Sequence, residues 1–152
     1  MKRTVAVLIS CALLLTVAIA AIGAPQGEGP RYVNLPGRTD DLPYSHLVVA
    51  GNTVYLSGTI GVDPDTGEAH TDIDAEIRQV LDNVKELLEH VGLTMDDLVS
   101  VQVFCPDLSL YDRFNAIYAT YFDENVPARA FVGSGPLLRN GHFEVQGVAV
   151  IR

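Results

Sequence analysis

The chain has 152 residues and a net charge of −9. That length suits one compact domain and leaves little room for a second. Phosphate binding needs clustered Lys and Arg, but the basic residues beyond Lys2 and Arg3 stand singly. We therefore expect neither nucleic acid nor an anionic lipid surface as the main partner.

Residues 1–24 have the order of a secretory signal peptide, with Lys2 and Arg3 first, then a long apolar run, then small residues up to Ala24. Their removal from the 152 residues would leave 128, and the loss of two basic residues would shift the net charge from −9 to −11. The apolar run is also about as long as a short membrane span, so an uncleaved anchor is the alternative. Too few apolar residues precede Cys11 for a lipoprotein box. The sequence predicts an exported protein, periplasmic or secreted, with no membrane attachment after cleavage.

The next segment, 25–42, is rich in Pro and Gly and is expected to be a flexible or extended entry to the domain. In residues 47–61, two short β-rich runs flank Gly51-Asn52, which predicts a hairpin. The turn-forming stretch 62–70 follows.

From Asp72 onward the apolar residues recur at helical spacing, which predicts an amphipathic helix of about five turns closed by Gly92. Alternating valines at 99–103 then predict a strand that stops before Pro106.

A second helix is predicted from the spacing of Leu110, Phe114, Ile117, Tyr118 and Tyr121, with Asp107 or Ser109 as its cap. The stretches 130–135 and 142–151 are expected to close the chain as strands.

These elements predict an α+β domain with both helices on one face of a sheet. In the last strand, one face mixes Val148 and Val150 with Glu144 and Gln146. A partly polar face of this kind suits a contact between subunits, so we expect an oligomer.

Metal and cofactor chemistry are not supported. His142 and Glu144 imitate the H-x-E half of zinc nucleobase deaminases, but the P-C-x-x-C segment is missing. The four histidines lack ligand spacing. The sequence also lacks a P-loop, a dinucleotide fingerprint and a nucleophile elbow. Cys105, the only cysteine beyond the leader, is expected to be buried and inert.

Arg129 and Glu144 remain as candidate chemistry. They lie on strands that are successive in sequence, so we expect them to be close in the sheet. A guanidinium grips a carboxylate by two hydrogen bonds, and a half-buried carboxylate can deprotonate a water. Together they suit a small substrate with an acid group at one end and an electrophilic carbon at the other. From spacing alone, a structural ion pair between the two is an equally open interpretation.

From Pro43 to Arg152 the chain resembles the Rid (YjgF) family of reactive-intermediate deaminases. The segments S-G-x-I, N-x-x-Y, P-A-R and a final E-V-x-x-x-A occur in family order. The resemblance implies a chorismate-mutase-like domain over residues 43–152, with a mixed sheet, assembled as a homotrimer with clefts between neighbouring subunits. It also implies hydrolysis of small 2-imino and enamine acids, such as 2-aminoacrylate and 2-iminobutyrate, to 2-keto acids and ammonia without metal or organic cofactor.

The resemblance assigns the substrate carboxylate to Arg129 and water activation to Glu144. The family's other cleft positions fall on Tyr44, Ser57, Gly58, Asn115 and Phe131. Phe131 replaces a cysteine common in the family, and Thr59 and Gln146 also depart from the usual pattern, which leaves the side chain of the substrate open.

Export would place the protein away from the cytosolic enzymes that produce imines. The alternative function is therefore an exported trimeric module that binds small carboxylates or proteins in the same clefts with little or no turnover. Ribonuclease activity, also attached to the family, is disfavoured by the acidic charge.

Overall fold

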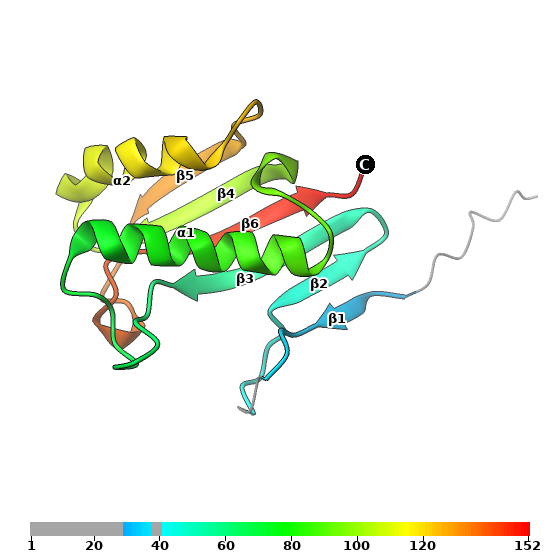
Figure 1. The fold of residues 1–152 in the computed structure, drawn as a ribbon, viewed down its shortest axis with the longest axis horizontal. Helices are drawn as coiled ribbons and strands as arrows, with labels where there is room; N and C mark the ends of the chain where they lie inside the picture. The colour runs from blue at the N-terminus through cyan, green and yellow to red at the C-terminus, as the bar shows by residue number, and fades with distance from the viewer. Residues whose placement is uncertain (1–28, 38–40) are drawn as a thin grey trace, which may run out of the picture.

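A six-stranded sheet carries two helices, α1 (Ile73–His90) and α2 (Tyr111–Tyr118), on one of its faces (Figure 1). This arrangement comes from a computed structural model that describes residues 29–37 and 41–152. It confirms the predicted α+β class. No helix of the described part is long and apolar enough to cross a membrane. The predicted signal peptide, 1–24, lies outside the described residues and stays a prediction.

The sheet has the order β1-β2-β3-β6-β4-β5. Its strands are β1 (Arg31–Val33), β2 (Leu47–Ala50), β3 (Thr53–Ile60), β4 (Leu98–Cys105), β5 (Ala128–Gly133) and β6 (Glu144–Val150). Only the β4–β5 pair is parallel, so the sheet is mixed. The predicted hairpin is β2–β3, and Gly51 adopts a φ of 62° in its turn, a conformation that glycine adopts readily.

β1 was not predicted as a strand. It lies within the segment 25–42, which was expected to be a flexible or extended entry, and it pairs antiparallel with β2 at the edge of the sheet. Three residues give too short a pattern for alternation to be recognised, and Tyr32 at its centre is 70% exposed. These three residues form a strand because they pair with β2, and not because they bury an apolar face of their own.

The first predicted helix is confirmed as α1, which has 18 residues. The side chain of Asp72 caps its first turn by accepting a hydrogen bond from the Asp74 amide at 2.9 Å, and Gly92 follows the last turn with a φ of 80°. The apolar stripe of this helix is buried against the sheet through Ile77, Val80, Leu81, Val84, Leu87 and Leu88.

The second predicted helix is shorter than its apolar pattern suggests. α2 has eight residues, and 3-10 turns at Leu108–Leu110 and Ala119–Tyr121 extend it at both ends. Asp107, one of the two predicted caps, accepts a hydrogen bond from the Ser109 amide at 2.9 Å. Tight turns preserve the apolar spacing for a few residues, which is why the pattern alone predicts one longer helix.

The two faces of the sheet differ. Under the helices, β6 buries Val145, Gly147 and Ala149, whereas the side chains between them are only half-buried on the open face. Tyr55 on that open face is 50% exposed. No described segment covers the open face (Figure 1).

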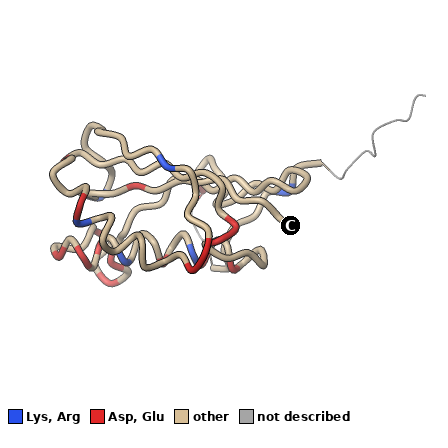
Figure 2. Tube along the Cα trace, turned by 90° about the horizontal axis from the view of Figure 1, so that it is seen from above, with Lys and Arg blue, Asp and Glu red and all other residues tan. Residues whose placement is uncertain are grey.

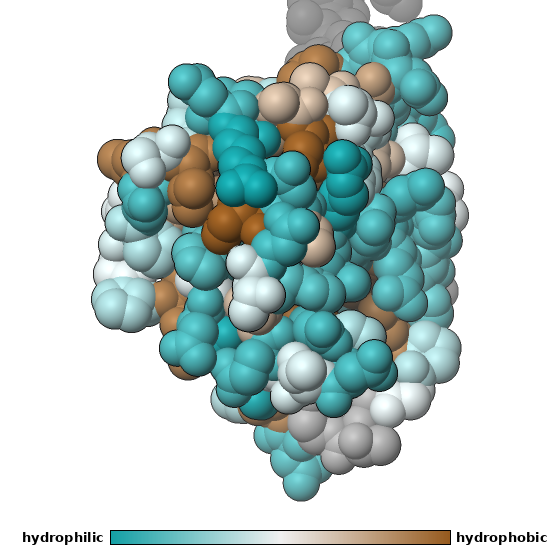
Figure 3. Space-filling view, turned by 60° about the vertical axis from the view of Figure 1, so that its left-hand side comes forward, coloured by the Kyte–Doolittle hydropathy of each residue, from teal (hydrophilic) through white to brown (hydrophobic). Residues whose placement is uncertain are grey.

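Acidic residues gather mainly along the helix layer, and basic residues are isolated (Figure 2). The end of the molecule that carries the first turn of α1 is mostly hydrophilic, with apolar side chains in small patches (Figure 3). Figure 2 shows no cluster of Lys and Arg among the described residues of the kind that nucleic-acid binding requires.

Candidate active site

Arg129 and Glu144 are not close in the sheet, so the prediction of proximity is wrong. β4 lies between their strands, with Val101 opposite both Arg129 and Gly147 and with Phe104 opposite Glu144. The two residues are thus separated by two strand spacings and by three residues along the strands, about 10 Å in each direction. Among the described residues no ion pair joins them.

They also lie on opposite faces. Arg129 reaches toward α2, where its guanidinium meets Asn115, and Glu144 lies on the open face. The interpretation of a structural ion pair between them is therefore wrong. A small molecule cannot contact both side chains within one chain.

Glu144 lines a cleft of about 720 Å³. Four of the predicted site residues meet there, and they are Tyr44, Ser57, Gly58 and Glu144. Thr59, which departs from the family pattern, also lines it, together with His46 and Arg139. Glu86 of α1 also lines it, so the cleft combines two carboxylates with several hydrogen-bonding groups and a cation.

The carboxylate of Glu144 lies directly against the backbone of β3. A Cβ added at Gly58 would overlap Glu144 Oε1 and lie 2.9 Å from its Cδ. The register of β3 with β6 also shifts between Leu56 and Thr59, which is a bulge at Ser57-Gly58. Glycine at position 58 is required for this close approach of the acid to β3.

Arg129 lies in a different environment, among aromatic rings. Its guanidinium donates to Asn115 Oδ1 and lies 4.5 Å from the ring centroid of Tyr118. The rings of Tyr111, Phe114 and Phe131 lie 5.8 to 5.9 Å from it. None of the carboxylates within the described ranges lies at ion-pair distance. The cation is fixed in direction, but its charge is unpaired.

The predicted site residues thus form two groups. Tyr44, Ser57, Gly58 and Glu144 form the group we call the acid half, and Asn115, Arg129 and Phe131 form the group we call the arginine half. Within one chain, Glu144 and Arg129 therefore line different parts of the surface.

Tyr118 belongs to the arginine half and was not singled out from the sequence. It is 4% exposed, and its hydroxyl is the one buried side-chain polar atom without a partner in the described part of the chain. Burial raises the pKa of Tyr118 to about 12, although the nearby Arg129 charge acts in the opposite direction. Its place three residues after Asn115 on a helix, within the N-x-x-Y segment, is the signal that identifies it.

Cys105 is fully buried, as predicted, and burial raises the pKa of its thiol. Its Sγ donates to the backbone oxygen of Asp107 at 3.1 Å. A thiol with a raised pKa is a poor nucleophile, so Cys105 is structural.

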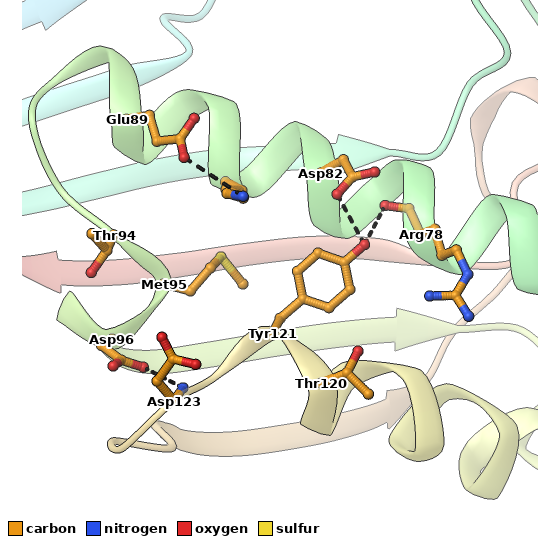
Figure 4. Close-up of a pocket in the computed structure, with 10 residues that line it drawn as sticks. Arg78, Asp82, Glu89, Thr94, Met95, Asp96, Thr120, Tyr121 and Asp123 are labelled. Carbon is orange, nitrogen blue, oxygen red and sulfur yellow. Dashed lines mark hydrogen bonds and ion pairs between the residues drawn. The ribbon is translucent and has the colours of Figure 1, made fainter.

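A second hollow, of about 590 Å³, lies between α1 and the segment around Tyr121 (Figure 4). Its polar groups are largely satisfied by one another. The Tyr121 hydroxyl donates to Asp82 at 2.9 Å, and Lys85 lies 3.7 Å from Glu89. The guanidinium of Arg78 forms no ion pair with another described residue, but none of the predicted site residues lines this hollow. Within residues 29–37 and 41–152, no three His, Cys, Asp or Glu side chains gather as a metal site.

The model of the family described as endoribonuclease L-PSP matches residues 39–151. The chain belongs to this family. A 2-iminobutanoate/2-iminopropanoate deaminase of Escherichia coli is 40% identical over 113 residues, which are 72% of this chain and 88% of that protein. A RutC family protein of Haemophilus influenzae is 42% identical over 112 residues, 71% of this chain and 86% of the relative.

Solved structures of L-PSP family proteins have the same fold. The crystal structure of the YjgF gene product of Escherichia coli superimposes with a TM-score of 0.73 at 36% identity, covering 80% of this chain and 99% of that one. The resemblance to the Rid (YjgF) family is thereby confirmed for family and subunit fold. Deaminases stand among its relatives, and so do proteins named only by family.

Proposed function

We propose that the protein hydrolyses small 2-imino and enamine acids to 2-keto acids and ammonia, with Arg129 binding the substrate carboxylate and Glu144 activating water. The observation that carries this is the unpaired guanidinium of Arg129, which Asn115 and four aromatic rings hold in place without a counter-ion. A fixed guanidinium fork matches a carboxylate by two parallel hydrogen bonds. The similarity to a 2-iminobutanoate deaminase supports the choice of substrate.

The site is completed by a neighbouring subunit of a homotrimer. Since the two halves occupy opposite faces of one sheet, they act on the same molecule only if the acid half of one copy meets the arginine half of another. The open face supports this arrangement, because it carries the exposed Tyr55 and the half-buried Val148 and Val150 beside Gln146. Self-association buries such a surface and places a cleft at each contact.

The reaction needs one water and no other reactant. Glu144 takes a proton from water while the water oxygen forms a bond to the imine carbon. Glu144 passes that proton to the imine nitrogen, which gives a carbinolamine. It then takes the hydroxyl proton of the carbinolamine and delivers it to the nitrogen as the carbon–nitrogen bond breaks, so that the oxygen forms the keto group and ammonia leaves. Arg129 holds the carboxylate so that the imine carbon faces the water, and this orientation lowers the barrier by several kcal/mol.

The test uses 2-iminobutyrate generated in place by an amino-acid oxidase, with loss of the imine followed for wild type, Arg129→Ala and Glu144→Gln. We expect Glu144→Gln to lower kcat by roughly 10²-fold or more, since a general base is removed. Arg129→Ala should chiefly raise KM. Arg78→Ala, at the second hollow, is the matched control and should behave like wild type.

Equal rates for wild type, both site variants and buffer would end the enzyme proposal. If the wild type then still bound 2-ketobutyrate in calorimetry, the protein would be the exported binding module instead. Light scattering tests the assembly. A monomer would leave the acid half and the arginine half without a shared site between subunits. The acidic helix layer gives no support to RNA as a substrate (Figure 2).

A further inference from the structure

Glu76 is the one charged side chain that is fully buried in the part of the chain the structure describes. It lies in the first turn of α1 and is 0% exposed. A buried carboxylate strongly destabilises a fold unless hydrogen bonds satisfy its oxygens. A buried acid beside a candidate active site therefore calls for an explanation beyond packing.

The partners of Glu76 are the residues just before the proposed base. Its Oε1 accepts from the backbone amides of His142 at 2.6 Å and Phe143 at 3.1 Å. Its Oε2 accepts from His142 Nδ1 at 2.7 Å. Because a carboxylate only accepts, this nitrogen carries the hydrogen of the bond. Both oxygens are thus occupied by one dipeptide.

That dipeptide lies outside the sheet ladder. β6 begins at Glu144, which is paired with Ile60 on one side and Phe104 on the other. The amides of His142 and Phe143 have Glu76 as their acceptor instead of a neighbouring strand. The carboxylate therefore extends the hydrogen bonding of β6 by two residues, up to the residue that carries the base.

The other wall of the acid half meets the same helix turn. A Cβ added at Gly61, just after β3, would lie 3.0 Å from Glu76 Cγ and would overlap the Glu76 backbone oxygen. The first turn of α1 thus packs between the end of β3 and the start of β6. These are the strands that bring Gly58 and Glu144 together.

We propose that Glu76 is a positioning residue that binds the backbone amides of His142 and Phe143, fixes the main chain before Glu144 and so aims the Glu144 carboxylate into the cleft. This inference rests on the proposed function, since it concerns the same base. Glu76 does not touch the substrate. It acts through the dipeptide 142–143, and its effect should appear in kcat rather than in KM.

The experiment compares Glu76→Ala, Glu76→Gln and His142→Ala in the full chain. Glu76→Ala leaves both amides without an acceptor and should lower kcat roughly 10-fold to 100-fold, because small misplacements of a base are costly, with KM within about twofold of wild type. Glu76→Gln keeps an oxygen for both amides and should retain kcat within about fivefold. His142→Ala keeps both hydrogen bonds from the backbone amides to Glu76, so its kcat should also stay within about fivefold of wild type.

A second measurement separates positioning from general stability. Amide hydrogen exchange should become faster at His142, Phe143 and Glu144 in Glu76→Ala while the core of α1 stays protected. Glu89→Gln, an exposed carboxylate change on the same helix, is the matched control and should change neither kinetics nor exchange. If Glu76→Ala does not fold, Glu76→Gln and His142→Ala provide the test, because both keep an acceptor for the two backbone amides. A kcat loss above tenfold in either folded variant contradicts the proposal that these two hydrogen bonds position Glu144.

The outcomes also distinguish this inference from the proposed function. An inactive wild type overturns the proposed function and this inference with it. An active wild type with an unchanged kcat in folded Glu76→Ala overturns the positioning role alone. A loss of kcat accompanied by faster exchange throughout the protein shows a merely structural role and also overturns it.

Discussion

The acid half and the arginine half hold their charged groups by opposite means. Glu144 is placed by the backbone, because it lies against Gly58 at a bulge and follows a dipeptide bound by Glu76. Arg129 is placed by aromatic rings and the neutral side chain of Asn115. A base must point in one direction, so hydrogen-bonded backbone suits it. An anion receptor must keep its charge unpaired, and π-faces orient a cation without neutralising it.

Complementation between two variants tests most directly whether the acid half of one subunit acts together with the arginine half of another. At imine concentrations well below the raised KM of Arg129→Ala, we expect Arg129→Ala and Glu144→Gln each to be nearly inactive, whereas subunits of the two co-assembled in equal amounts should recover activity. In a random trimer roughly a quarter of the contacts would join an intact arginine half to an intact acid half. The measurement is imine hydrolysis after joint refolding, with each variant refolded alone as the control. No recovery in mixed trimers would show that the halves do not meet between subunits.

Gly58→Ala should alter the acid half and leave the arginine half unchanged. The added Cβ would overlap Glu144 Oε1, so the carboxylate must move away from β3. We expect kcat to fall roughly 10²-fold while binding of a keto-acid product, which we assign to Arg129, changes little. Gly135→Ala is the control, because a Cβ there meets nothing within 4 Å. Wild-type kcat in Gly58→Ala would mean that close approach to β3 is irrelevant to the base.

Much of the fold could be predicted from the sequence because local patterns dictate it. The stripe and caps of α1, the hairpin at Gly51-Asn52 and the strand before Pro106 each depend on nearby residues. The order of the strands in the sheet does not depend on nearby residues. β4 lies between β5 and β6, and this order depends on contacts between residues far apart in the sequence. The prediction that Arg129 and Glu144 are close was wrong because it assumed that successive strands are neighbours.

The candidate site could be predicted only in part, for the same reason. The residues of both halves carry recognisable motifs, yet their division between two faces depends on the register of three strands. In the helical pattern that starts at Asp72, Glu76 falls on the polar side. No local pattern indicates that it meets His142, 66 residues away, because that contact exists only when α1 lies on the sheet.

Asn115→Asp tests whether the charge of Arg129 must stay unpaired for substrate binding. An aspartate would accept from the same guanidinium and neutralise it, so substrate would compete with a built-in carboxylate. We expect KM to rise roughly tenfold or more, with kcat less affected. Asn115→Ala is the matched control, since it removes the hydrogen bond but leaves the cation unpaired, and its KM should rise less. A smaller effect of Asp than of Ala would contradict an unpaired receptor.

The smallest effect concerns Tyr118, whose ring lies under Arg129 and whose hydroxyl has no described partner. Tyr118→Phe should leave stability at neutral pH within about 1 kcal/mol, because the hydroxyl forms no hydrogen bond that could be lost. At alkaline pH the two proteins should differ. The folded pKa of Tyr118 is about 12 against an ordinary value of 10, so the unfolded chain loses this proton first as the pH rises. Stability is therefore fully present below pH 10 and is lost progressively toward pH 12.

A shift of this size corresponds to about 2 to 3 kcal/mol across that window. Urea unfolding at pH 8, 10 and 11.5 should show a shallower decline for Tyr118→Phe than for wild type. Tyr121, with a pKa raised to about 12 mainly by burial and also by the Asp82 hydrogen bond, should account for part of the remaining decline. Identical slopes for wild type and Tyr118→Phe would show that the Tyr118 hydroxyl reaches solvent, and the aromatic support of Arg129 would then be looser than that of Glu144.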